Sequence, residues 1–181
     1  MKKLSIPAVV AFVVLVAGTV GAQADSGSGT FVYVAGAEPL CTIIGPAACP
    51  DVARADNGDT VEIAGAGSLS IHSKSVVGGG SFRHKAPDGT VRATGTWSAL
   101  TLLSFNSYGS QPDLPPNLVG GLARMRVHLT PSAGGPGVDA LLEIDCEIGK
   151  VPGGHLEGVR LVVDNGLNFN QKVSGFTVFV Q

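Results

Sequence analysis

The polar side chains best suited to chemistry alternate with apolar residues along two neighbouring segments, 122–130 and 139–148, or flank a turn at 86–89. Arginine can hold a carboxylate through two parallel hydrogen bonds. Histidine titrates near neutral pH and can act as a general acid or base. The candidate ligand-binding residues are therefore Arg124, Arg126, His128, Glu143, Asp145, His84 and Arg92.

These charges permit two interpretations. If the two segments pair with Arg126 opposite Glu143 and Arg124 opposite Asp145, opposite charges meet on one face and apolar residues meet on the other. The simpler interpretation is a solvated outer face, on which each ion pair contributes under about 1 kcal/mol. The alternative places the row inside a barrel, where it would bind a small hydrophobic or carboxylate ligand.

No motif identifies an enzyme. The chain has no phosphate-binding loop, no nucleophile elbow and no zinc-binding helix motif, so catalytic residues stay unassigned. The four histidines, His72, His84, His128 and His155, lack the local spacing of metal ligands. We therefore expect no metal site and no cofactor, and enzymatic activity is left open.

Three cysteines carry a separate prediction. Cys41 and Cys49 flank a short segment with a Gly-Pro turn, and a disulfide between them would close a small loop. Cys146 lies in an apolar strand pattern and is expected to be a buried thiol. Such pairing requires an oxidising compartment.

The first 24 residues have the features of a cleaved secretory signal peptide. Lys2 and Lys3 precede an apolar run over 6–17, and Ala22-Gln23-Ala24 is a small-x-small cleavage site. The run is too short for a membrane span, which needs roughly 20 apolar residues. We therefore expect export to the periplasm or the extracellular space, and no membrane span in the mature chain.

The charge balance excludes one class of partner. Of the 12 Lys and Arg, two lie in the leader, so 10 remain against 14 Asp and Glu, a formal net charge of −4 for residues 25–181. Nucleic-acid binding requires a basic surface, so we expect no nucleic-acid partner. With 44% hydrophobic residues the chain is too apolar for disorder.

The elements that position these residues are predicted to be strands. Beyond the leader the apolar pattern has a period of two, broken by Gly, Pro, Asn and Asp, and helical periodicity is almost absent. The clearest hairpins are 81–99, closed by Pro87-Asp88-Gly89, and 122–148. The sequence predicts one all-β domain over 25–181, a single antiparallel barrel of about eight strands, with a β-sandwich as the alternative.

Recurring Gly-x-aromatic spacing carries a resemblance. Gly80-Ser81-Phe82, the turn at 88–91, Gly95-Thr96-Trp97 and the stretch 153–159 are followed by a last aromatic strand. Together they resemble the small barrels of the allene oxide cyclase and dirigent type, and secreted bacterial β-proteins with the same spacing. The resemblance implies a barrel and assigns no catalytic residue.

Three functions follow as expectations. The first is a secreted small-molecule binding or structural module. The second is a cyclase- or isomerase-like enzyme acting on a small hydrophobic substrate. The third is a cell-envelope interaction protein that uses exposed strand edges or the proline-rich loop at 106–117. The sequence leaves the oligomeric state open.

Overall fold

The computed structural model describes residues 29–181 and confirms an all-β fold. One antiparallel sheet of ten strands contains most of this range. The segment between the first two strands, here called the excursion, forms a short α-helix and a 3-10 turn. The elements are β1 (Thr30–Ala35), α2 (Leu40–Ile44), η1 (Pro46–Ala48), β2 (Asp51–Ala55), β3 (Thr60–Ser70), β4 (Ser75–Lys85), β5 (Val91–Gly109), β6 (Leu118–Pro131), β7 (Val138–Cys146), β8 (Gly158–Val163), β9 (Asn168–Ser174) and β10 (Thr177–Val180).

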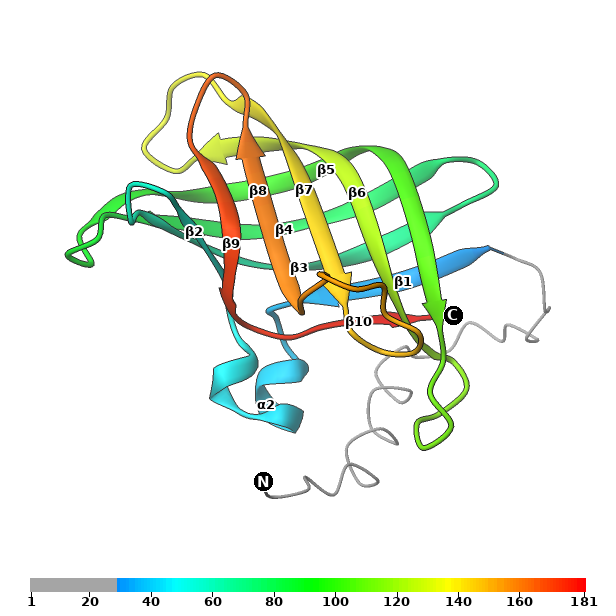
Figure 1. The fold of residues 1–181 in the computed structure, drawn as a ribbon. Helices are drawn as coiled ribbons and strands as arrows, with labels where there is room; N and C mark the ends of the chain where they lie inside the picture. The colour runs from blue at the N-terminus through cyan, green and yellow to red at the C-terminus, as the bar shows by residue number, and fades with distance from the viewer. Residues whose placement is uncertain (1–28) are drawn as a thin grey trace.

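The strand pairings partly close this sheet into a ring. Each strand from β2 to β8 is hydrogen-bonded to the next strand along the chain, and β9 pairs back with β2. β1 and β10 pair with each other and link β3 to β6. In Figure 1, β6 to β9 cross the front of the molecule and β1 to β4 lie behind them. The inward faces of the two layers therefore share one core.

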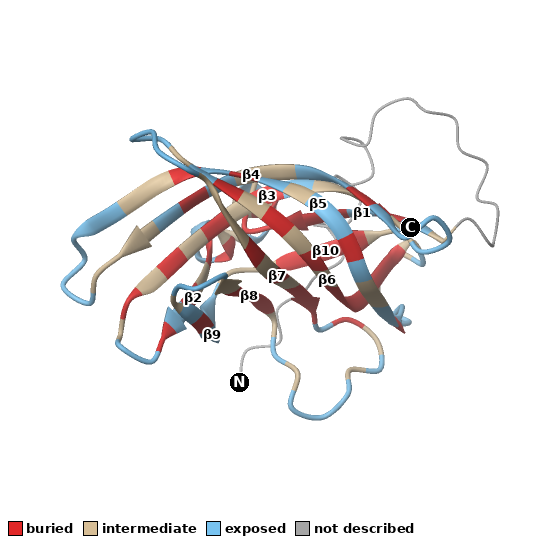
Figure 2. Ribbon diagram, turned by 90° about the horizontal axis from the view of Figure 1, so that it is seen from above, coloured by how far each residue is buried: buried red, intermediate tan, exposed pale blue. Residues whose placement is uncertain are grey.

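Alternating side chains fill that core. On β6, Met125 and Val127 are fully buried, whereas the alternating residues Arg124, Arg126 and His128 are only partly buried. Figure 2 shows the same alternation as short bands of buried and less buried residues along the strands. Trp97 also points inward, and its indole lies against Gly65, where a Cβ would come within 2.4 Å of the ring. A larger residue at position 65 would displace the tryptophan.

β5 is the strand that turns the corner between the two layers. It is 19 residues long, and its pairing with β6 shifts register at three places. Each shift leaves one additional residue on β5, namely Leu100, Leu103 and Tyr108. Such bulges bend a strand and redirect its side chains. Tyr108 is thereby buried, whereas both leucines are about half exposed.

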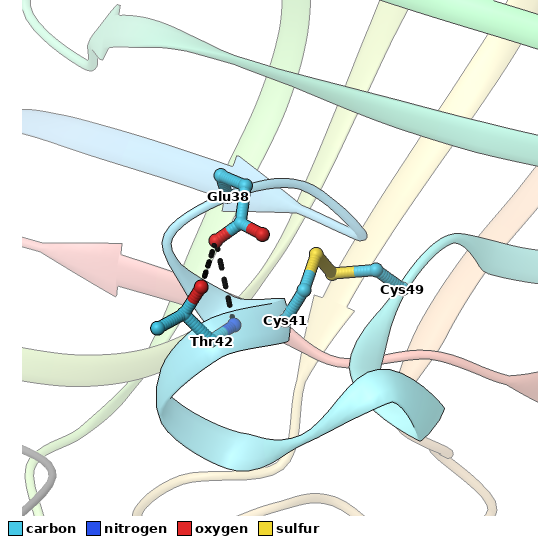
Figure 3. The surroundings of a disulfide bond; sticks show 4 residues. All are labelled: Glu38, Cys41, Thr42 and Cys49. Carbon is cyan, nitrogen blue, oxygen red and sulfur yellow. Dashed lines mark hydrogen bonds between the residues drawn. A yellow bond between two sulfur atoms is a disulfide. The ribbon is translucent and has the colours of Figure 1, made fainter.

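The excursion between β1 and β2 is held by the predicted disulfide. Cys41 and Cys49 are bonded, with their Cα atoms 5.4 Å apart (Figure 3). The Glu38 carboxylate accepts hydrogen bonds from the backbone amide and the hydroxyl of Thr42. Leu40 packs beneath this segment in a second apolar cluster, which covers part of β1 and β10. The excursion thus closes over the outer face of those two strands.

The structure corrects several details of the predicted strands. Both predicted hairpins are present, but there are ten strands rather than about eight, and β2 and β9 were not predicted. The predicted register of the 122–148 hairpin was wrong by two residues, since Arg124 lies opposite Glu143 and His128 opposite Asp139. A shift of two preserves the face of every side chain. The predicted signal peptide lies outside the described residues.

Candidate functional site

An apolar cavity opens in the interior of the ring, close to the turns at one end of the strands. Its volume is about 170 Å³, and seven consecutive strands, β3 to β9, contribute to its wall. Every lining side chain is apolar except one histidine. The lining residues are Val61, Phe82, His84, Ala93, Leu129, Pro131, Val138, Leu161, Val163 and Phe169.

His84 is held at this cavity by an acidic partner. Its Nε2 lies 2.7 Å from the Asp59 carboxylate, whose side chain is only 3% exposed. The Arg92 Nε lies 3.2 Å from the same carboxylate oxygen. The ring of Phe169 meets the imidazole edge-on at 5.3 Å. These contacts fix the orientation of the histidine.

The turn between β2 and β3 places Asp59 within reach. The Asn57 side chain accepts a hydrogen bond from the Asp59 amide, and Gly58 between them has a φ of 87°, which only glycine adopts readily. The sequence indicated His84 and Arg92 as candidate residues. It did not indicate that Asp59 would be their common partner, because that contact joins two different hairpins.

This arrangement can bind an apolar molecule that carries one polar group. Since the Asp59 carboxylate engages Nε2 of His84, Nδ1 is the ring nitrogen left for a ligand. A neutral imidazole that donates from Nε2 accepts at Nδ1, and a protonated imidazole donates there. The apolar wall would exclude water from the rest of the ligand.

Four of the other candidate residues lie on the outer face, away from this cavity. Arg124, Arg126, His128 and Glu143 alternate with the fully buried residues of β6 and β7. Their partners lie on the same outer surface, so the geometry matches the solvated ion-pair interpretation. The contacts are Arg124 Nε to Glu143 at 2.7 Å, Arg160 to Glu143 at 3.7 Å, Arg126 Nη1 to Asp164 at 3.0 Å and His128 Nδ1 to Asp139 at 2.6 Å.

Asp145 belongs instead to a buried polar cluster where β7 ends. Its carboxylate accepts a hydrogen bond from the Tyr108 hydroxyl at 3.0 Å and one from the Lys172 ammonium at 2.9 Å. His155 Nδ1 lies 3.0 Å from the same carboxylate and 2.9 Å from the Tyr108 oxygen. Burial lowers the pKa of Lys172, whose side chain is 3% exposed. We infer that these mutual contacts hold the 147–157 loop in place.

Asp51 and Glu157 form the second part of this polar region. Glu157 accepts hydrogen bonds from the amide and hydroxyl of Thr177 and from the amide of Glu147. Within residues 29–181, neither carboxylate oxygen of Asp51 has a hydrogen-bond partner, and the residue is fully buried. Burial, and then the charge of Glu157, raises the pKa of Asp51 to about 8. Burial also raises the pKa of Glu157.

A second hollow, of about 330 Å³, lies over β3, β4 and β5. Glu62 and Arg83 line it and form an ion pair at 3.6 Å, and Lys85 also contacts Glu62. Because these charges are already paired, a ligand would have to displace them. We therefore favour the apolar cavity as the binding site.

Residues 29–181 contain no group of three His, Cys, Asp or Glu side chains arranged to hold a metal ion. In the same range, no helix has the length and apolar character needed to cross a membrane. Cys146 is a buried free thiol, and burial raises its pKa. Comparisons with protein-family models, with curated proteins and with solved structures found no match to this chain.

Proposed function

We propose that this protein binds a small, mostly apolar molecule in the cavity beside His84. The observation that carries the proposal is an apolar cavity of about 170 Å³ whose lining contains one oriented imidazole. Ligand sites typically combine an apolar lining with a few fixed polar groups. The candidate residues His84 and Arg92 thus belong to this site, with Asp59 as their common partner.

The cavity volume limits the ligand to about one ring. In another protein, an apolar cavity of about 150 Å³ stays free of water and binds benzene. A single aromatic or alicyclic ring, or the end of a short acyl chain, is the corresponding size here. A hydroxyl, carbonyl or carboxylate on that ligand would meet Nδ1 of His84.

Fluorine NMR with fluorobenzene and 4-fluorophenol tests this proposal. Both probes should bind, and the phenol should bind about fivefold more tightly, because one hydrogen bond contributes about 1 kcal/mol. Ala93→Leu fills the cavity and should abolish binding of both probes. The matched control Ala66→Leu makes the same change at an exposed strand position and should leave binding intact.

His84→Phe separates the polar contact from the apolar wall. This variant should retain fluorobenzene binding and lose the preference for the phenol. No binding to the wild type at about 10 mM probe would refute the proposal, because even weak fragments bind in that range. Equal binding by Ala93→Leu and the wild type would place the probe elsewhere.

We also propose a barrel architecture and a location outside the cytoplasm. The eight strands that pair in sequence from β2 back to β2 support a small barrel of the kind that the Gly-x-aromatic resemblance implies. Export is supported by the leader pattern over residues 1–24 and by the Cys41–Cys49 disulfide. N-terminal sequencing of protein recovered from the culture medium and the cell envelope tests it. A chain that still begins at Met1 would contradict cleavage.

A second candidate function is proton transfer on the bound molecule, as in an isomerase or cyclase. The observation that favours it is the short His84–Asp59 contact at the cavity, since a carboxylate partner orients the imidazole for proton transfer. His84→Gln should then abolish turnover and retain binding of the apolar probe. If the protein leaves its natural ligand chemically unchanged after incubation, binding without turnover is the function.

A further inference from the structure

β5 presents one unpaired edge. β4 pairs with β5 only as far as the pair Gly79–Ser98, whereas β6 pairs with β5 as far as Gly109. Among the described residues, no strand pairs with the other side of β5 over 99–109. In Figure 1 this half of β5 descends at the margin of the front layer, beside β6. Tyr108 O accepts a hydrogen bond from the Lys150 amide, so the part of the edge that is available to another strand is 99–107.

The residues along this edge do not protect it from pairing. From residue 93 to residue 111 the sequence contains no charged residue and no proline. Leu100 and Leu103 are 49% and 50% exposed. Natural sheets usually guard an exposed edge with charges, proline or bulges, and only the bulges are present here. The bulges limit pairing to a short ladder and direct both leucines outward.

We propose that this edge, residues 99–107 of β5, is the interface of a homodimer, in which two copies pair antiparallel about a two-fold axis. A two-fold axis at Leu102 would place Leu103 of one copy opposite Thr101 of the other, and Leu100 opposite Ser104. These residues all lie on the less buried face of β5, so the two pairs of leucines would meet on one face of the joined sheet. Antiparallel pairing of a strand with itself satisfies both edges at once.

Charge favours a second copy as the occupant. An uncharged edge can face itself without bringing like charges together or burying an unpaired charge. The formal net charge is −2 for the whole chain and −4 for residues 25–181, so long-range repulsion between copies is small. The same edge offers no charged group with which to select a charged partner. This inference does not depend on the cavity or on its ligand.

Analytical ultracentrifugation of the purified protein, in the form that its host produces, tests the proposal. Between about 1 µM and about 200 µM we expect a monomer–dimer equilibrium, the range typical of a small interface. Leu100→Lys with Leu103→Lys should weaken dimerisation at least tenfold, because it places like charges across the axis. The matched control is Val91→Lys with Val173→Lys, at residues 50% and 45% exposed elsewhere, and it should not change dimerisation.

Hydrogen exchange of the wild type gives a second readout that does not depend on variants. Amides within 99–107 should exchange more slowly at high than at low protein concentration, and other exposed amides should not. A monomer at 200 µM would overturn the proposal, and so would a dimer that the two lysines leave unchanged. Concentration-dependent protection confined to another strand would also overturn it.

Discussion

Asp51 provides the sharpest test of the buried polar region. Its carboxyl is fully buried and has no hydrogen-bond partner in the described part of the chain, and burial raises its pKa from 3.8 to about 8. Because the folded protein holds this proton more tightly than the unfolded chain, the proton stabilises the fold below about pH 4. That stabilisation is lost as the pH rises towards 8. Asp51→Asn removes the titration and keeps the shape.

The size of the effect follows from the pKa shift. One proton bound by the folded state alone changes the free energy of unfolding by about 1.4 kcal/mol per pH unit. Relative to the wild type, Asp51→Asn should therefore gain about 3 kcal/mol of stability between pH 5 and pH 7. At pH 4 the two proteins should be nearly equal, since the wild-type carboxyl is then neutral. The raised pKa of Glu157 acts in the same direction and persists in the variant.

Urea denaturation followed by fluorescence of Trp97 measures this difference. Trp97 is the only tryptophan and is buried, so unfolding exposes it. A gain of 3 kcal/mol corresponds to a midpoint about 1–2 M higher in urea. The control Asp113→Asn changes an exposed carboxylate and should leave the pH slope unchanged. A stability difference that does not vary with pH would refute a neutral, buried Asp51.

Three further predictions concern residues around this region and the excursion. Gly175→Ala should lower the free energy of unfolding by about 2–4 kcal/mol, because φ there is 116° and the methyl group would lie 1.9 Å from the Asp51 carboxylate; Gly153→Ala, with nothing within 4 Å, is the neutral control in the same thermal melts. Lys172→Met should cost about 3–5 kcal/mol by leaving Asp145 buried without its cation, and adding Asp145→Asn should recover part of that loss in urea titrations. Replacing both Cys41 and Cys49 by alanine should cost about 2.5 kcal/mol, the loop-closure value for their separation of 8, and calorimetry that shows no change would exclude a stabilising role.

The sequence predicted the strands that alternate most regularly. The hairpin over 81–99 was predicted by its Pro-Asp-Gly turn, and the Cys41–Cys49 pair by its short spacing and its own turn. β2 and β9 were not predicted because their segments, Asp51–Ala55 and Asn168–Ser174, contain few large apolar residues. They form strands because they pair with each other, and because β2 also pairs with β3 and β9 with β8.

The register of β6 and β7 could not be predicted from alternation. Sliding one strand by two residues keeps every side chain on its face, so the apolar pattern is equally satisfied. The observed register brings His128 beside Asp139, and the imidazole occupies the space where Gly137 would carry a Cβ. Contacts of individual side chains near the turn, which alternation does not specify, therefore accompany the observed pairing.

Asp145 shows why face assignment does not determine burial. It shares the outward-facing parity of Glu143, and a sequence pattern gives both residues the same environment. In the folded chain the 147–157 segment, Tyr108 and Lys172 close over Asp145 and leave Glu143 on the surface. Coverage by a distant segment has no local signature, so this part of the polar region could not be foreseen.

The polar cluster around Asp145 and the cavity beside His84 differ in whether their polar groups are left available to a ligand. Around Asp145, the hydroxyl, imidazole and ammonium groups all bind one carboxylate, so a ligand there would have to break contacts that hold the fold. At the cavity, Asp59 fixes one nitrogen of His84, and the histidine is the one polar residue in an otherwise apolar lining. Buried polar groups that satisfy one another stabilise a structure, whereas an oriented group facing an open apolar space favours a ligand. This difference is why we place the binding function at His84 and a structural role at Asp145.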